Sequence, residues 1–141
     1  MKARLTWVVF WALVAAFVAV ASVFLIPAAR EAVTGLVMAI SGAVLFLLGA
    51  ALVFLAVKRQ PPGMPRRFLI LTGASAAGIP VSVLLHNVIY GLFIHCFGPD
   101  FWDRIGLADE PVFFVLAILV CPTAFLVGTI GTIVLVTKRP R

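Results

Sequence analysis

The residues best suited to chemistry form a small polar group near one end of a long apolar stretch. Ser82, His86, Asn87 and Tyr90 lie within Phe68–Phe97, a segment that is otherwise mostly apolar. Serine, histidine and tyrosine recur there at four-residue spacing, so a helix would place them along one stripe. Polar side chains inside a membrane-spanning helix are the default candidates for function. We therefore predict an intramembrane polar site at these four residues.

His86 has three possible roles in such a site. A neutral imidazole both donates and accepts, so it can join neighbouring helices together with Asn87 and Tyr90. It can also line a pathway for a small solute, or contact a quinone or another redox group. His86 and His95 are nine residues apart, and at about 100° per residue they point to opposite faces of a helix, so they cannot clamp one haem in a monomer. We expect no cofactor.

Further candidate ligands surround the connection that follows this segment: His95, Asp100, Asp103, Asp109 and Glu110. Histidine and carboxylates suit several divalent ions, but no diagnostic ligand spacing occurs here. Asp109 and Glu110 also have structural roles to fill, because Asp109 can cap the helix that Pro111 begins and Glu110 can complement its positive end. We predict no metal site.

The two cysteines do not form a redox pair in the sequence. Cys96 and Cys121 would differ in depth by on the order of 10 Å along their helices, whereas a disulfide needs Cα atoms within about 7 Å. The sequence also contains no CxxC pair, no Ser/His/Asp arrangement and no phosphate-binding glycine loop. We therefore predict no catalytic residues and a protein that is not an enzyme.

Four long apolar segments must position the polar residues. Of 141 residues, 64% are hydrophobic and 11% are charged, whereas globular domains are about 25% charged. A transmembrane helix needs roughly 20 apolar residues. The sequence therefore predicts an all-α polytopic integral membrane protein, a single four-helix bundle domain over residues 1–141, with spans at about Leu5–Ile26, Ala32–Val57, Phe68–Phe97 and Val112–Thr137.

Charge alternates between the segments that flank these spans. The two termini and the second connection carry nine Lys or Arg residues and no acid, whereas the first and third connections carry all five acids and two arginines. The positive-inside rule then predicts cytoplasmic N- and C-termini. The net charge of +6 is spread over three segments, so we interpret it as membrane orientation and expect no nucleic acid partner. Small size and short loops favour a prokaryotic cell (inner) membrane.

The connection between the third and fourth spans predicts a short interfacial helix. Asp100 is placed to cap this helix, and Gly106 is placed to end it. Phe101 and Trp102 are expected to lie on the membrane surface, where aromatic rings are enriched.

Small residues predict packing faces on two of the spans. Gly35, Gly42 and Gly49 recur every seven residues, a spacing that keeps one face turned towards a partner helix. Glycine lets the two backbones approach closely. The expected partner is the first span, and a second copy or another subunit is the alternative. In the third span, Ala74 and Gly78 provide a second close-packing surface. The matching small residues of the first span are Ala12, Ala15, Ala19 and Ser22.

Two prolines predict irregularities inside spans. Pro80 lies in the middle of the third span and Pro122 lies within the fourth. Proline removes a backbone donor and clashes with the preceding turn, so we expect a kink at each.

These features favour a non-catalytic accessory or assembly subunit that works through helix–helix contact in the lipid bilayer, as a homo-oligomer or with another membrane subunit. An oligomeric channel or carrier for a small solute, lined by His86, Asn87 and Tyr90, is the first alternative. A redox or quinone-contacting membrane component that uses His86 is the second.

Overall fold

The chain is helical, as its sequence predicts. The computed structural model describes residues 2–138, without the side chains of Lys2, Ala3, Ala29, Arg30 and Ala32, and no strand occurs in this range. Four stretches are long and apolar enough to cross a membrane: Arg4–Leu25, Gly35–Arg59, Met64–Phe97 and Pro111–Thr137. The prediction of four apolar helices of membrane-spanning length is therefore confirmed.

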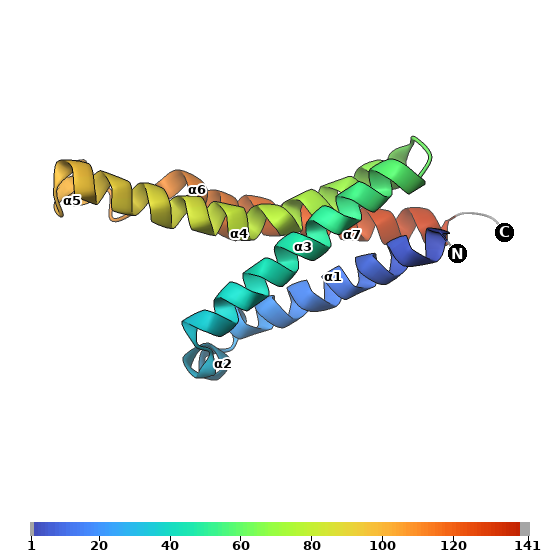
Figure 1. Cartoon of the computed structure of the whole chain (residues 1–141), viewed down its shortest axis with the longest axis horizontal. Coiled ribbons are helices and arrows are strands. Elements are labelled where there is room, and N and C mark those ends of the chain that lie inside the picture. The colour runs from blue at the N-terminus through green and yellow to red at the C-terminus, as the bar shows by residue number, and fades with distance from the viewer. Residues whose placement is uncertain (1, 139–141) are drawn as a thin grey trace.

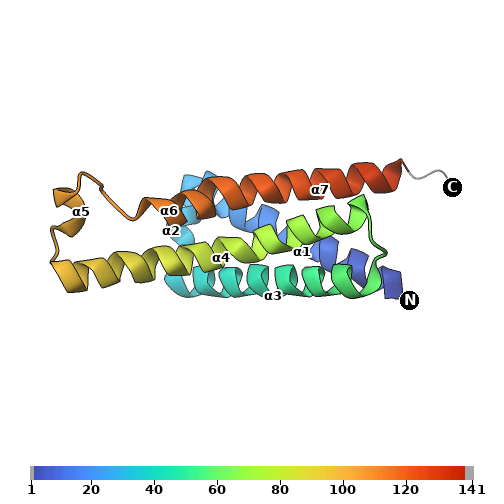
Figure 2. The same ribbon diagram turned by 90° about the horizontal axis from the view of Figure 1, so that it is seen from above.

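The helices form two antiparallel hairpins. The first consists of α1 (Lys2–Leu25) and α3 (Gly35–Arg59), which are joined through the short α2 (Pro27–Ala32). In the second, α4 (Met64–Phe97) lies beside a helical stretch made of α6 (Pro111–Val115), the π-helical turn η1 (Leu116–Val120) and α7 (Cys121–Thr137), after a connection that contains α5 (Phe101–Arg104). Figures 1 and 2 show α4 extending beyond the level of α2 and α6, with α5 at its far tip.

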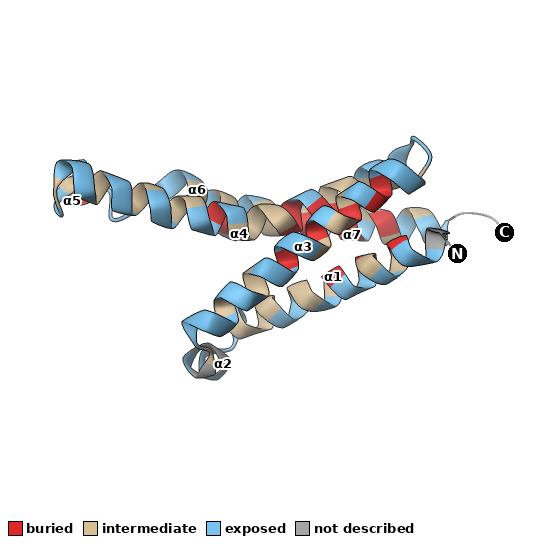
Figure 3. Cartoon of the chain, viewed as in Figure 1, coloured by how far each residue is buried: buried red, intermediate tan, exposed pale blue. Residues whose placement is uncertain are grey.

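The two hairpins cross each other instead of running side by side. Figure 1 shows α3 crossing α4 in the half of the molecule where α1 begins and α7 ends, which we call the terminal end. Towards α2 and α5, which we call the open end, the first hairpin diverges from the second. Most buried residues lie near the crossing (Figure 3). The apolar core there is formed by Phe10, Leu13, Leu45, Leu52, Ala56, Leu69, Ala76 and Phe125.

Backbone contact between glycines makes the crossing possible. A Cβ atom added to Gly49 would lie 2.5 Å from the carbonyl oxygen of Gly73, and one added to Gly73 would lie 2.6 Å from that of Gly49. On the other side of α4, a Cβ atom on Gly128 would lie 2.7 Å from the backbone nitrogen of Thr72. Without side chains at these positions, α3 and α7 approach α4 closely enough for extensive van der Waals contact.

The predicted partner of the glycine stripe in the second span was wrong. Gly49 lies against α4, and a Cβ on Gly42 would meet Pro80 of the same helix at 3.4 Å, while Gly35 has no neighbour within 4 Å. The stripe therefore faces the third span and not the first. In α1, the three alanines of the matching stripe are exposed, and contact with the other helices comes from larger residues such as Phe17, whose ring stacks on Phe125 at 4.0 Å.

Of the two packing residues predicted in the third span, Gly78 makes a close contact and Ala74 does not. Ala74 is exposed, and its neighbour Gly73 makes the contact with α3. Gly78 lies against α7, since an added Cβ would be 3.0 Å from Cys121 Sγ.

The two prolines behave differently. Pro80 lies inside α4, which continues through it as one helix. Before Pro122 the backbone forms a π-helical turn, in which the N–H of Cys121 donates to the carbonyl of Leu116. Such turns are rare and interrupt regular helix geometry. The kinks expected at Pro80 and Pro122 stay predictions.

The connection at the open end differs from the prediction in two ways. α5 is a single turn after Asp100, but the Asp100 side chain makes no capping hydrogen bond. Trp102 does not lie outwards on a membrane surface: it is 7% exposed, and its ring stacks on Tyr90 with centroids 5.8 Å apart. Gly106 adopts a φ of +75°, as expected for a residue that ends this turn.

Candidate functional site

The four residues of the predicted polar site do not form one patch. Ser82 is buried beside Cys121 of α7, and His86 and Tyr90 continue along the same face of α4. Asn87 is exposed on another face, where its Nδ2 donates to the carbonyl of Val83 at 2.7 Å. The structure therefore separates His86, which contacts Asp109 and Glu110 in what we call the histidine cluster, from Asn87, which borders an apolar groove.

The histidine cluster joins α4 to the start of α6. His86 Nδ1 lies 3.1 Å from the backbone carbonyl oxygen of Glu110 and 3.3 Å from its Oε2. His86 Nε2 lies 3.4 Å from Oδ2 of Asp109. A carbonyl oxygen only accepts, so a proton on Nδ1 makes the bond to Glu110. The doubly protonated imidazolium can donate on both sides, and a neutral ring with its proton on Nδ1 can donate to Glu110 alone.

Glu110 is held in this position because its carboxylate also caps α6. Its Oε1 accepts from the backbone N–H of Val112 at 2.8 Å, and its Oε2 accepts from that of Phe113 at 3.0 Å. These bonds satisfy N–H groups that no helix carbonyl reaches, and Pro111 supplies no donor at the first position. The predicted capping roles are therefore exchanged: Glu110 caps α6, and Asp109 Oδ1 accepts from the N–H of Glu110 at 2.7 Å.

Aromatic rings cover the cluster at the open end. The ring of His86 lies 6.4 Å from that of Tyr90 and 5.8 Å from that of Phe114. Trp102 Nε1 donates to the carbonyl of Tyr90 at 3.4 Å and ties α5 to α4. As a result the His86 side chain is 16% exposed and that of Glu110 is 5% exposed, whereas Asp109 is 48% exposed.

This arrangement is suited to holding helices together. His86 connects α4 to the start of α6 through hydrogen bonds and not through apolar packing. His95, which the sequence places with the acidic residues, is exposed and takes no part in the His86 contacts. Within residues 2–138, no group of three or more His, Cys, Asp or Glu side chains has the arrangement of a metal site.

The sequence contained a signal for the contact between His86 and Glu110, but spacing along one helix did not reveal it. α4 has 34 residues, about 51 Å at 1.5 Å per residue, and it continues about 16 Å beyond His86. The connection must return over that length before the next helix begins, which brings its last residues, Asp109 and Glu110, level with His86. The greater length of the third span shows that the connection must fold back beside it, but the difference in length does not select His86 as the residue that is met.

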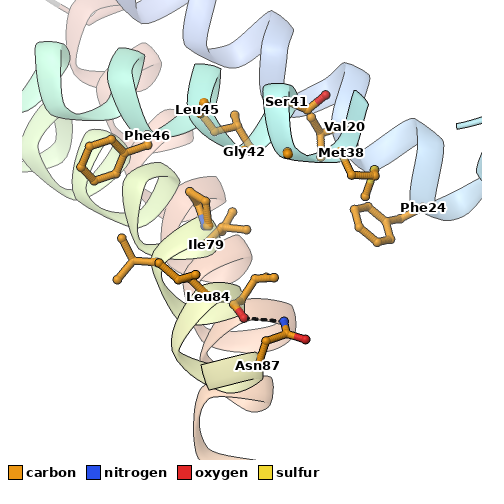
Figure 4. Close-up of a pocket in the computed structure, with 15 residues that line it drawn as sticks. Val20, Phe24, Met38, Ser41, Gly42, Leu45, Phe46, Ile79, Leu84 and Asn87 are labelled. Carbon is orange, nitrogen blue, oxygen red and sulfur yellow. Dashed lines mark hydrogen bonds between the residues drawn. The ribbon is translucent and has the colours of Figure 1, made fainter. Parts of the chain in front are cut away.

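A groove separates the two hairpins on the other side of α4. It has a volume of about 740 Å³ and is lined by residues of α1, α3 and α4. Figure 4 shows Phe24 and Met38 at one side and Leu84 and Asn87 at the other, with Gly42 beside Ser41 on α3. Pro80 also lines the groove, but His86 and Tyr90 do not.

The lining of the groove is apolar, with small residues on one wall. α3 contributes the small residues Ala39, Ser41, Gly42 and Ala43, and these alternate with the larger Met38, Leu45 and Phe46. The hydroxyl of Ser41 donates to the carbonyl of Val37 in its own helix. Asn87 likewise uses one amide hydrogen within α4, and its side-chain oxygen makes no hydrogen bond to the described part of the chain.

Comparisons with protein-family models, with curated proteins and with solved structures gave no match for this chain.

Proposed function

We propose that this protein is a non-catalytic membrane subunit, and that its groove receives a transmembrane helix of another membrane protein. The observation that carries the proposal is the groove itself, where Ala39 and Ala43 of α3 are exposed beside the point at which the hairpins diverge. Helices associate in lipid through small residues that let backbones approach, and through interhelical hydrogen bonds. A helix seated between the hairpins would complete a bundle at the open end.

Asn87 supports a helix as the occupant. In hydrocarbon an amide without a partner is unfavourable, and asparagine is a frequent contributor to hydrogen bonds between membrane helices. Asn87 borders the groove, and its side-chain oxygen makes no hydrogen bond to the described part of the chain, so a Ser, Thr, Asn or Gln on the incoming helix is a suitable donor. A lipid chain offers no such donor.

The alternatives from the sequence receive less support from this geometry. A solute pathway was to be lined by His86, Asn87 and Tyr90, but only Asn87 borders the groove. The redox alternative relied on His86, which is engaged by Glu110 and Asp109.

We further propose that both termini are cytoplasmic, in a prokaryotic cell membrane. The support is the charge distribution: the connection between α3 and α4 is basic, whereas the segments at the open end carry all five acids.

Photo-crosslinking in native membranes tests the proposed function. A photoreactive side chain at Ala43, in the groove, is compared with one at Ala50, which is exposed on the same helix outside it. We expect Ala43 to give one defined protein adduct, Ala50 to give none, and Ala39→Leu to abolish the adduct. Adducts with lipid alone, or with a second copy of the chain, would contradict a partner subunit.

A further inference from the structure

Arginine side chains line a second, smaller pocket at the terminal end. It has a volume of about 260 Å³ and lies where the turn between α3 and α4 meets the start of α4. Its lining consists of Pro62, Gly63, Arg66, Arg67 and Ile70. Two arginine residues, a proline–glycine turn and one apolar residue therefore line one concave site.

No acidic side chain of this protein is positioned to neutralise the two arginines. Within the described part of the chain, the only acids in ion-pairing contact are Asp109 and Glu110, both with His86. All five acids belong to the connections at the open end. Arg66 is half-buried and Arg67 is exposed, so both remain accessible to a ligand. An anion from outside the chain is the counter-charge that fits.

The turn that carries the arginines is rigid. Pro61, Pro62 and Pro65 fix three backbone φ angles. Gly63 adopts a φ of +151°, which other residues rarely adopt, and its carbonyl accepts from the N–H of Arg67 at 3.2 Å. A site with little freedom to lose binds its ligand with a smaller entropic cost.

The mixture of lining residues matches one kind of ligand. Arginine binds phosphate oxygens with a planar, two-donor geometry. Ile70 lies one turn deeper in α4, on the side towards the hydrocarbon, and offers contact to an apolar chain. Basic pockets beside transmembrane helices bind anionic headgroups. We propose that this pocket binds the phosphate of an anionic phospholipid in the leaflet at the terminal end. This proposal does not depend on the helix-binding groove.

Native mass spectrometry of the purified chain, titrated with phosphatidylglycerol or phosphatidylcholine, tests the proposal. The variant Arg66→Gln/Arg67→Gln is compared with Lys58→Gln/Arg59→Gln, which removes the same charge from the same connection but leaves the pocket lining unchanged. Thermal unfolding of each variant reports whether it folds. Arg66→Lys/Arg67→Lys, which keeps the charge and loses the two-donor geometry, serves if the glutamine variant does not fold.

We expect the wild type and Lys58→Gln/Arg59→Gln to retain phosphatidylglycerol in preference to phosphatidylcholine, and loss of both pocket arginines to weaken retention roughly tenfold or more, as expected for lost charged hydrogen bonds. The lysine variant should weaken it less. Equal weakening by the two glutamine variants would show a diffuse charge effect and overturn the site. Displacement of the lipid by millimolar inorganic phosphate at constant ionic strength would assign the pocket to a free anion and overturn the lipid proposal.

Discussion

The terminal end and the open end of this protein are held together by different forces. At the terminal end, α3, α4 and α7 meet through glycines, and the contact is between backbones and apolar side chains. At the open end, α4 is joined to the start of α6 by the contact between His86 and Glu110, and to α5 by the hydrogen bond that Trp102 donates to the Tyr90 carbonyl. The first hairpin makes no comparable contact with the second (Figure 1).

The comparison shows that the helices are closely packed at the terminal end and leave a groove at the open end. Close glycine contacts have no substitute, because any added atom would meet backbone. The polar contacts at the open end lie only within the second hairpin. The half of α3 towards the open end therefore has exposed groove residues, among them Ala39 and Ala43, that no described helix covers. A self-sufficient crossing and an unfilled groove are what we expect of a subunit that folds alone and then receives a partner.

The largest expected effect is at the crossing. Gly49→Ala places a Cβ 2.5 Å from the Gly73 carbonyl oxygen, so α3 and α4 must separate, at a cost of roughly 1–3 kcal/mol or more. Thermal unfolding followed by circular dichroism measures the loss. Gly91→Ala in α4 is the matched control: nothing lies within 4 Å of its added Cβ, so improved helix propensity should leave stability unchanged or raise it by up to about 1 kcal/mol. Equal melting of the two variants would contradict close packing at the crossing.

The next effect is at the open end. Glu110→Ala removes both the cap of α6 and an acceptor of His86, and we expect a loss of about 1–2 kcal/mol of unfolding free energy. Asp103→Ala removes an exposed acid from the same connection and should change stability by no more than about 0.5 kcal/mol. If both variants melt alike, Glu110 does not organise this end.

A double-mutant cycle isolates the contact between α4 and α6. His86→Ala, Glu110→Ala and the double variant should show a coupling energy of about 0.6 kcal/mol, with roughly 1.7 as the upper value found for hydrogen bonds between membrane helices. The cycle reports the contact between His86 Nδ1 and the Glu110 carboxylate at 3.3 Å, because Glu110→Ala keeps the backbone carbonyl that lies 3.1 Å from His86. Additive losses would mean that the side-chain contact carries no net interaction.

The sequence predicted the elements of this fold better than their contacts. Apolar length identified all four long helices, and the charge pattern separated their ends. The heptad marked a packing face at Gly42 and Gly49 but not at Gly35, and periodicity does not name the helix that the face meets. The true partner residue, Gly73, lies one position away from the stripe that begins at Ala74, so a four-residue repeat could not reveal it.

The candidate site divided for a similar reason. Ser82, His86 and Tyr90 share a face because they are four residues apart, and Asn87 lies one step around the helix, on the groove. The partner of His86 comes from a distant connection, and the roles of Asp109 and Glu110 depend on which side chain reaches the free N–H groups. Only the path of the chain between the two helices settles these choices.

The smallest expected effect on stability belongs to the groove. Ala43 is exposed, so Ala43→Leu should change the unfolding free energy by no more than about 0.5 kcal/mol. It should nevertheless reduce association with a partner helix, because the leucine occupies the space that the helix requires. Thermal unfolding and co-purification in mild detergent, with Ala50→Leu as the control, measure the two quantities. Unchanged association would remove the groove from the interface.

Two spin-label distances between α3 and α4, measured in lipid nanodiscs, test the central claim most directly. One pair, at Phe54 and Ala74, lies near the crossing, and the other, at Leu36 and Val88, lies near the open end; all four residues are exposed. The two native cysteines, which are free, are first replaced. We predict a short distance at the crossing and a clearly longer one at the open end. Similar distances, as in a bundle whose helix axes stay about 8–10 Å apart along their length, would contradict an open groove.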